Sequence, residues 1–238
     1  MAKAYLEPAE VNQLEEVAEY LRDKLLIRML FRIGCRVSEV LGISVNDVDF
    51  NQGAVTIEHL KLRINLSCLD CGTRLSKTAR FCPGCGQKVE QAIAREKEHH
   101  RVRTLPLDAD TLQMLRDYIE RGGPVSRNGK QVLFGVNRRH AWKIVSDCAE
   151  KAGLGELVNP ETGKVHGVSP HKLRDAFAVM AVQHDDSMDS IRMLQEQLGH
   201  ANIATTMRYR KVAGQELKKW YSELWEKKDA RARNSNHK

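Results

Sequence analysis

The sequence predicts a mainly α-helical domain with a small antiparallel β-sheet, an α+β fold. Three observations support this prediction. Apolar residues recur at helical spacing through most of the 238-residue chain. Two stretches, 53–64 and 101–107, alternate and are rich in β-branched residues, which is typical of the two strands of a hairpin. Four clustered cysteines lie between these stretches, so we expect them in an insertion at the hairpin tip.

The segment before the hairpin is expected to be helical. Residues 8–21 begin with a proline in an acidic first turn, which suits a helix N-terminus. The apolar helix over residues 22–34 is expected to stop at Gly34. Ser38 is expected to cap a short helix that ends at residue 43.

Helical periodicity returns after the hairpin. Ser169 is the expected cap of one of these helices, and Pro170 is its first residue. The last helix carries a narrow apolar face, and the polar tail over residues 229–238 is expected to be disordered. The expected helices are 108–122, 137–153, 169–184, 187–199, 203–212 and 214–228. We therefore assign residues 1–228 to one domain, which contains the insertion.

Composition narrows the classes of partner and compartment. The formal net charge of +7 favours a polyanionic partner such as double-stranded DNA. Apolar runs are shorter than a membrane span, and the N-terminus lacks the apolar core of a signal peptide. We expect a cytoplasmic, nucleoid-associated protein without a membrane partner. Six cysteines in such a chain indicate metal ligands or reduced thiols rather than disulfides.

Two C-x-x-C-G knuckles predict a zinc ribbon over residues 66–90. Each knuckle can supply two thiolates to one tetrahedral Zn²⁺, and the four ligands are Cys68, Cys71, Cys82 and Cys85. All four coordination positions are then filled, so the Zn²⁺ is expected to be structural. The two remaining cysteines, Cys35 and Cys148, lie in apolar helical surroundings and are expected in the core.

A set of cationic residues and one tyrosine is suited to attack on a phosphodiester. His171 and Arg174 share one helix face, and Arg36 links two helices. Two guanidinium groups can hold the non-bridging oxygens with forked hydrogen bonds as charge builds up in the transition state. Tyr209 can act as the nucleophile, while a protonated amine or imidazole supplies a proton to the departing 5′ oxygen.

The order of these segments resembles the tyrosine recombinase (phage integrase) family. The segments "GCRVSEVLGISVNDVDF", "HKLRDAFA" and "LGHANIATTMRY" carry the resemblance, which covers nearly all of the chain except the insertion and the tail. The residues that match the family pattern are Arg36, Lys61, His171, Arg174, His200 and Tyr209. The resemblance implies the catalytic-domain fold of that family, with the zinc ribbon inserted in a β-hairpin.

The resemblance also implies a role for each matching residue. Arg36 and Arg174 would clamp the scissile phosphate, and Tyr209 would form a 3′-phosphotyrosyl bond. Lys61 would protonate the 5′ leaving group, whereas the two histidines would assist in proton transfer and phosphate binding. The chemistry would need no cofactor. Such a protein would be a site-specific recombinase or integrase, with a mobile element as one possible source.

Several residues depart from the family pattern or have competitors. Lys97, near the returning strand, competes with Lys61, and Lys77 inside the ribbon is a further alternative. Asp175 stands where many family members carry a histidine, and we infer no loss of activity from it. Glu39 is expected to be a buried partner that positions helices.

Two further expectations concern DNA binding and assembly. Almost nothing precedes the catalytic domain, where most family members have a DNA-clamping domain, so the chain is either a truncation or a natural minimal recombinase. The ribbon would then reach the flanking duplex or a neighbouring protomer. Residues 215–225 are expected to dock onto an adjacent protomer of a tetrameric synapse or to fold back in cis.

Three other functions are consistent with parts of the sequence. A type IB topoisomerase-like enzyme would use the same residues to cleave and reseal without a preferred site. A non-catalytic DNA-binding regulator could keep the fold, but it would have no need for Tyr209. A transcription or RNA-binding factor would use the zinc ribbon alone.

Overall fold

The computed structural model describes residues 3–76, 78–159 and 162–210, with residues 59–65 and 94–101 described by their backbone alone. The helices are α1 (Pro8–Val17), α2 (Leu21–Arg32), α3 (Val37–Val40), the 3-10 helix η1 (Val45–Asp47), α4 (Ala109–Glu120), α5 (Arg138–Lys151), α6 (Pro170–His184), α7 (Met188–Leu198) and α8 (Ile203–Arg210). The strands are β1 (Val48–Asp49), β2 (Ala54–Cys68), β3 (Arg74–Leu75), β4 (Ala92–Pro106), β5 (Val125–Arg127), β6 (Lys130–Val132), β7 (Leu157–Val158) and β8 (Val165–His166).

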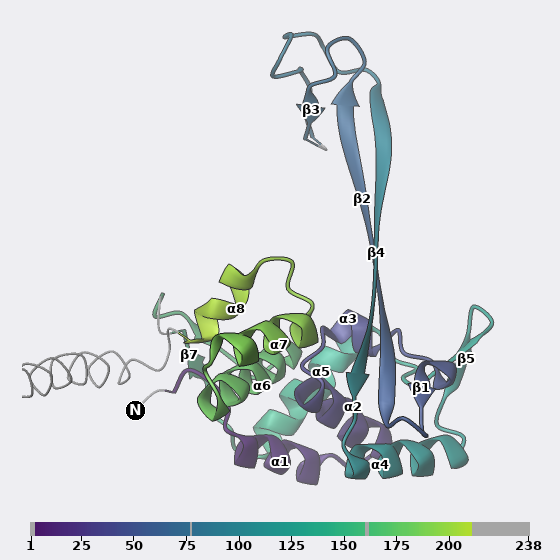
Figure 1. Ribbon diagram of the computed structural model, residues 1–238, viewed down its shortest axis with the longest axis vertical. Coiled ribbons are helices and arrows are strands. Elements are labelled where there is room, and N and C mark those ends of the chain that lie inside the picture. The colour runs from purple at the N-terminus through teal and green to yellow at the C-terminus, as the bar shows by residue number, and fades with distance from the viewer. Residues whose placement is uncertain (1–2, 77, 160–161, 211–238) are drawn as a thin grey trace, which may run out of the picture.

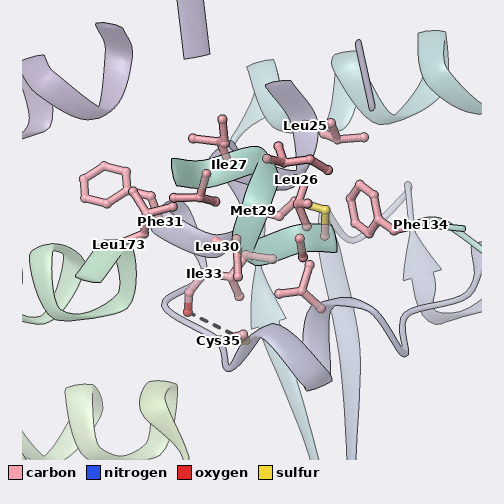
Figure 2. Packing of buried hydrophobic residues seen from close by; sticks show 14 of the residues in the cluster. Leu25, Leu26, Ile27, Met29, Leu30, Phe31, Ile33, Cys35, Phe134 and Leu173 are labelled. Carbon is pink, nitrogen blue, oxygen red and sulfur yellow. Dashed lines mark hydrogen bonds between the residues drawn. The ribbon is translucent and has the colours of Figure 1, made fainter. Parts of the chain in front are cut away.

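Helix α2 forms the centre of a helical body. Most of its apolar side chains are fully buried, among them Leu26, Met29 and Leu30. Figure 2 shows these side chains with Phe134 and Leu173, which come from outside α2. Helices α1, α4 and α6 pack against α2. Burying a leucine or methionine side chain contributes about 1.5–3 kcal/mol, so this apolar helix organises the body around it.

The predicted helix-rich fold is confirmed, and so are several helix ends. The expected helix ends at Arg32, two residues before Gly34, whose φ of +65° suits glycine. Helix α6 begins at Pro170 with Ser169 as its N-cap, as expected. The predicted cap at Ser38 is wrong, because α3 already begins at Val37. Arg36 is the N-cap residue, with an extended backbone just before the helix, and its N–H donates to the Glu39 carboxylate at 3.0 Å.

A long two-stranded hairpin leaves the helical body (Figure 1). Strands β2 and β4 pair antiparallel along their whole length, from Ala54 opposite Pro106 to Cys68 opposite Ala92. The returning strand therefore begins earlier than the predicted residue 101. The outer half of β4 carries a run of charged residues, 95–98, so it shows no alternation of apolar and polar residues. Its extended conformation comes from pairing with β2.

Two short hairpins were not predicted from the sequence. In the first, β5 pairs with β6 around Asn128 and Gly129, which have φ of 51° and 75°. An Asn-Gly pair between short strands is a strong hairpin signal, so this turn could have been found. The second hairpin pairs β7 with β8 just before α6.

Candidate active site and metal cluster

One cavity of about 680 Å³ collects most of the residues expected to act on a phosphodiester. Five of the six line it, namely Arg36, His171, Arg174, His200 and Tyr209. They come from the link before α3, from α6, from the turn after α7 and from α8. Helices α6, α7 and α8 pack against one another, and this packing brings the sequence-distant side chains together.

Arg174 is the most enclosed residue of the cavity, with 2% of its surface exposed. Its Nη1 donates to the Gly34 carbonyl at 2.7 Å and its Nη2 to the Leu198 carbonyl at 2.8 Å. Burial lowers the pKa of Arg174, and the nearby charge of Arg36 acts in the same direction. Two fixed backbone carbonyls therefore hold one of the three arginines that line the cavity, the others being Arg36 and Arg208.

Gly34 makes this contact possible. A Cβ at this position would lie 2.4 Å from the Phe177 ring, and the backbone φ of +65° disfavours other residues. The carbonyl of Gly34 can therefore approach α6 closely enough to accept from Arg174.

His200 is held in one tautomer. Its Nε2 lies 2.9 Å from Arg174 Nη2, and its Nδ1 lies 2.9 Å from Thr206 Oγ1. A guanidinium can only donate, so Nε2 accepts and Nδ1 carries the proton. Burial, together with the positive charges of Arg174 and Arg36, lowers the pKa of His200 to about 4. In this arrangement His200 is neutral at pH 7 and orients Arg174.

Tyr209 lines the cavity, and its hydroxyl has a partner that the sequence did not predict. Its hydroxyl donates to Asp175 Oδ1 at 2.8 Å, and its ring stacks on His200 with centroids 6.4 Å apart. Burial raises the pKa of Tyr209, and the negative charge of Asp175 raises it further. His171 is also in the cavity, and its side chain is 73% exposed.

Arg36 is positioned by a buried carboxylate. Glu39, only 1% exposed in its side chain, accepts from Arg36 Nη1 at 2.9 Å and from Arg103 Nη2 at 2.7 Å. Arg103 comes from β4, so this contact ties the base of the hairpin to the active site. Burial alone would raise the pKa of Glu39, but hydrogen bonds from Arg103 and the Arg36 backbone lower it to about 2.

Replacing Glu39 by Gln is expected to destabilise the fold by about 3–5 kcal/mol, because Arg103 loses its buried charge partner. The lowered pKa means that this contribution is present above the pKa of an unfolded glutamate, about 4.3. It is lost as the pH falls through about 2. Urea unfolding of both proteins should therefore give a difference that is constant near neutral pH and shrinks in acid.

The control for this measurement is Glu16→Gln, which makes the same change at an exposed position of α1. It should leave the unfolding free energy nearly unchanged. Equal stability of the Glu39 variant and wild type would show that the arginine contacts contribute nothing to the fold.

Lys61 and Lys97 both lie in the long hairpin. Lys61 is opposite His99 in the register, whereas Lys97 is opposite Arg63 and two positions further from the body. Both lysines are described by their backbone alone, and Lys77 lies outside the described residues. The choice among the three lysines stays a prediction.

The four clustered cysteines meet at the far end of this hairpin (Figure 1). The two knuckles have the same backbone hydrogen bonds: Gly72 N–H donates to the Cys68 carbonyl at 3.0 Å, and Gly86 N–H to that of Cys82 at 2.9 Å. All four Sγ atoms lie within 4.8 Å of one another. Cys68 and Cys82 are buried in a small apolar cluster with Leu75.

This arrangement fits a tetrahedral metal ion. With Zn–S bonds of about 2.3 Å, tetrahedral geometry places two sulfurs about 3.8 Å apart. The Cys68 and Cys85 sulfurs are 3.8 Å apart, and those of Cys71 and Cys82 are 3.4 Å apart. The cluster can therefore hold one metal ion. Zn²⁺ favours coordination by four thiolates.

The other two cysteines are buried in the helical body, as expected. Burial raises the pKa of the Cys35 thiol to about 11, so it stays protonated and unreactive at neutral pH. Asp175 lines the cavity, whereas Arg103 and Thr206 support it through Glu39 and His200, and none of these contacts was predicted from the sequence. For Asp175 a signal existed, because it lies four residues after His171 on the same helix face.

Among residues 3–76, 78–159 and 162–210, no helix has the length and apolar character needed to cross a bilayer.

A crystal structure of XerA recombinase matches 94% of the chain and 64% of its own length, with a TM-score of 0.59 and 20% identity. The Tn1549 transposon integrase in complex with transposon right end DNA matches 92% of the chain and 66% of its own length, with a TM-score of 0.58 and 18% identity.

Curated relatives match over most of the chain. Tyrosine recombinase XerD of Neisseria meningitidis serogroup A is 29% identical over 201 residues, 81% of this chain and 51% of its own length. Tyrosine recombinase XerA of Pyrococcus horikoshii is 28% identical over 209 residues, 88% of this chain and 57% of its own length. The chain thus spans about half the length of these relatives.

The helix-rich fold is shared with a recombinase and an integrase of known structure. The model of the phage integrase family matches residues 4–216. The chain belongs to the phage integrase family.

Proposed function

We propose that the chain is a site-specific DNA recombinase that cleaves and rejoins strands through a covalent 3′-phosphotyrosyl intermediate. The observation that carries this proposal is the single cavity that places Tyr209 beside Arg36 and Arg174. Two guanidinium groups can hold the non-bridging oxygens of a phosphate while the tyrosine attacks the phosphorus. Named tyrosine recombinases among the relatives support the same reaction.

The remaining roles follow the geometry of the cavity. His200 contacts Arg174 through Nε2. It therefore assists phosphate binding by keeping the Arg174 guanidinium in place. His171 can contact the phosphate directly, because its side chain is largely exposed. Lys61 is the proposed general acid for the 5′ leaving oxygen, because it is the hairpin lysine nearer to the body.

The proposed partner is double-stranded DNA. The net charge of +7 favours a polyanion, and structural relatives include a transposon integrase in complex with DNA. A tetrameric synapse through residues 215–225 stays a prediction, because these residues lie outside the described part of the chain. A cytoplasmic, nucleoid-associated location, the disordered tail and the domain boundaries also stay predictions.

The cysteine module, residues 66–90, is proposed to hold one structural Zn²⁺. The sulfur separations and the matching knuckles support this assignment. The chemistry at Tyr209 requires no metal in this proposal, because the charge on the phosphate is met by arginines.

The cysteine module is proposed to contact flanking duplex or a neighbouring protomer. From the buried Ile57 to Cys68, β2 extends about 36 Å at its usual rise, close to one turn of duplex DNA. Exposed Arg74 and Arg80 could meet phosphates, whereas Phe81, 63% exposed, could meet protein.

A shortened hairpin tests this contact. Leu62 and Glu98 are paired in the register, so an Asn-Gly turn replacing residues 63–97 would close the hairpin while keeping Lys61. We expect DNA affinity or strand exchange to fall at least about ten-fold, the effect of losing about 1.4 kcal/mol of contact. Retained cleavage would also eliminate Lys77 and Lys97 as the general acid. Unchanged affinity and strand exchange would remove the proposed contact.

The test of the function starts without a known target site. Wild-type protein is incubated with a randomised duplex library carrying nicks, and only DNA that stays attached after denaturation is recovered. Peptide mapping of the adduct should place the DNA on the peptide containing Tyr209, and sequencing should reveal a preferred site. DNA binding without adducts would instead support the regulator.

The topoisomerase-like alternative predicts a different result. Such an enzyme would relax a supercoiled plasmid that lacks the selected site, and one protomer would suffice. A site-specific recombinase should exchange strands only between duplexes that carry the recovered sequence.

A further inference from the structure

The hydroxyl of Tyr209 is already bound to a proton acceptor. It donates to Asp175 Oδ1 at 2.8 Å, within the range required of a general base. Both residues line the cavity that also contains Arg36 and Arg174, and Asp175 is only 8% exposed. Asp175 follows Arg174 on α6, so the helix that carries the buried arginine also presents the carboxylate to α8.

The histidines of the cavity are engaged differently. Both ring nitrogens of His200 have partners, since Nε2 faces Arg174 and Nδ1 faces Thr206. The Nε2 of His171 lies 3.9 Å from Asp175 Oδ1, so this imidazole adjoins the carboxylate. Asp175 is therefore the described residue whose geometry suits removal of the Tyr209 proton.

We propose that Asp175 is a catalytic residue, the general base that accepts the proton of Tyr209 during attack on DNA. This inference rests on the proposed recombinase function and deepens it. As the Tyr209 oxygen bonds to phosphorus, its proton moves to Asp175 Oδ1. The bond between phosphorus and the 5′ oxygen breaks, and that oxygen takes a proton from the general acid, for which Lys61 is proposed. Rejoining reverses each transfer.

The proton transfer must accompany bond formation. A carboxylate is a much weaker base than a phenolate, so Asp175 cannot deprotonate the free tyrosine in advance. The phenolic oxygen becomes acidic only as it bonds to a phosphate held by the arginines. Tyr209 is thus protected from unproductive ionisation until DNA is bound.

One neighbour reduces the repulsion between Asp175 and an incoming phosphate. The Lys172 ammonium lies 3.9 Å from Asp175 Oδ2. A nearby ammonium lowers the cost of placing a carboxylate beside a phosphodiester.

The first test replaces Asp175 by Asn, which can accept the hydrogen bond of Tyr209 but cannot take its proton. The rate of adduct formation on the nicked duplex recovered from the library is expected to fall about 10²–10⁴-fold. The remaining rate should rise with pH, since solvent hydroxide then takes the proton. The control Asp147→Asn removes the same charge from an exposed ion pair with Lys143 on α5 and should keep the wild-type rate.

A second variant separates loss of the base from loss of structure. Asp175→Ala should be as slow as Asp175→Asn, and added formate should recover part of the adduct rate by occupying the vacated carboxylate position. Wild-type or faster cleavage by Asp175→Asn, or no response of Asp175→Ala to formate, would overturn the assignment.

A measurement without DNA distinguishes this inference from the proposed function. Subtracting the ultraviolet titration curve of Tyr209→Phe from that of the wild type isolates the ionisation of Tyr209. The Asp175→Asn substitution should lower the Tyr209 pKa. An unchanged pKa would overturn the contact itself. If the pKa falls but wild-type protein forms no adduct on any duplex, the proposed function fails and the catalytic role of Asp175 fails with it.

Discussion

Tyr209→Phe is expected to abolish covalent attachment to DNA while DNA binding persists. The variant keeps the ring, which stacks on His200, and loses only the hydroxyl. Without its nucleophile the enzyme should lose activity on the order of 10⁶-fold, as other enzymes with covalent nucleophiles do. The measurement is the yield of DNA that remains attached to protein after denaturation, beside binding measured on the same duplex.

The fold should survive this substitution. Removing the hydroxyl leaves Asp175 without one hydrogen bond, at a cost of about 1–3 kcal/mol. The matched control is Tyr20→Phe, which makes the same change at a residue that is 64% exposed and outside the cavity. Adducts formed equally by Tyr209→Phe and wild type would place the nucleophile elsewhere and refute the proposed mechanism.

Loss of the metal is expected to unfold the cysteine module and leave the helical body intact. The apolar cluster of the module is small, with Leu75 as its buried leucine beside Cys68 and Cys82. Structural zinc sites contribute an apparent 10–16 kcal/mol, about the whole stability of a small domain. The body has its own core around α2, so it does not depend on the metal.

Cys82→Ala is the variant that tests the metal site. Wild-type protein should contain one zinc per chain, and the variant should contain none. Hydrogen exchange should speed up in residues 66–90 and stay slow in α2. Cys148→Ala removes a buried thiol from α5 and should retain the zinc. Either of two results would refute the assignment. The first is wild-type protein that was prepared with zinc but contains no bound metal, and the second is a Cys82→Ala variant whose amides in the module stay protected.

The hydrophobic pattern predicted much of the fold because helical periodicity is a local property. Gly34 and Pro170 mark helix ends through their own backbone preferences, so their roles were readable without tertiary contacts. The outer half of β4 was missed, because its extension depends on pairing with β2 rather than on its own residues. The true cap at Arg36 was missed because it depends on a carboxylate three residues later.

The order of the family motif and the spacing of the two cysteine knuckles can be read directly from the chain. Which of those side chains lie in contact depends on how the helices and strands pack. Packing of α6 against α8 joins Asp175 to Tyr209, and the base of β4 brings Arg103 to Glu39. Such contacts link residues far apart in the chain, so they depend on how helices and strands pack together rather than on local preference. For this reason the nucleophile could be named from the sequence, whereas the hydrogen bond that it donates to Asp175 could not.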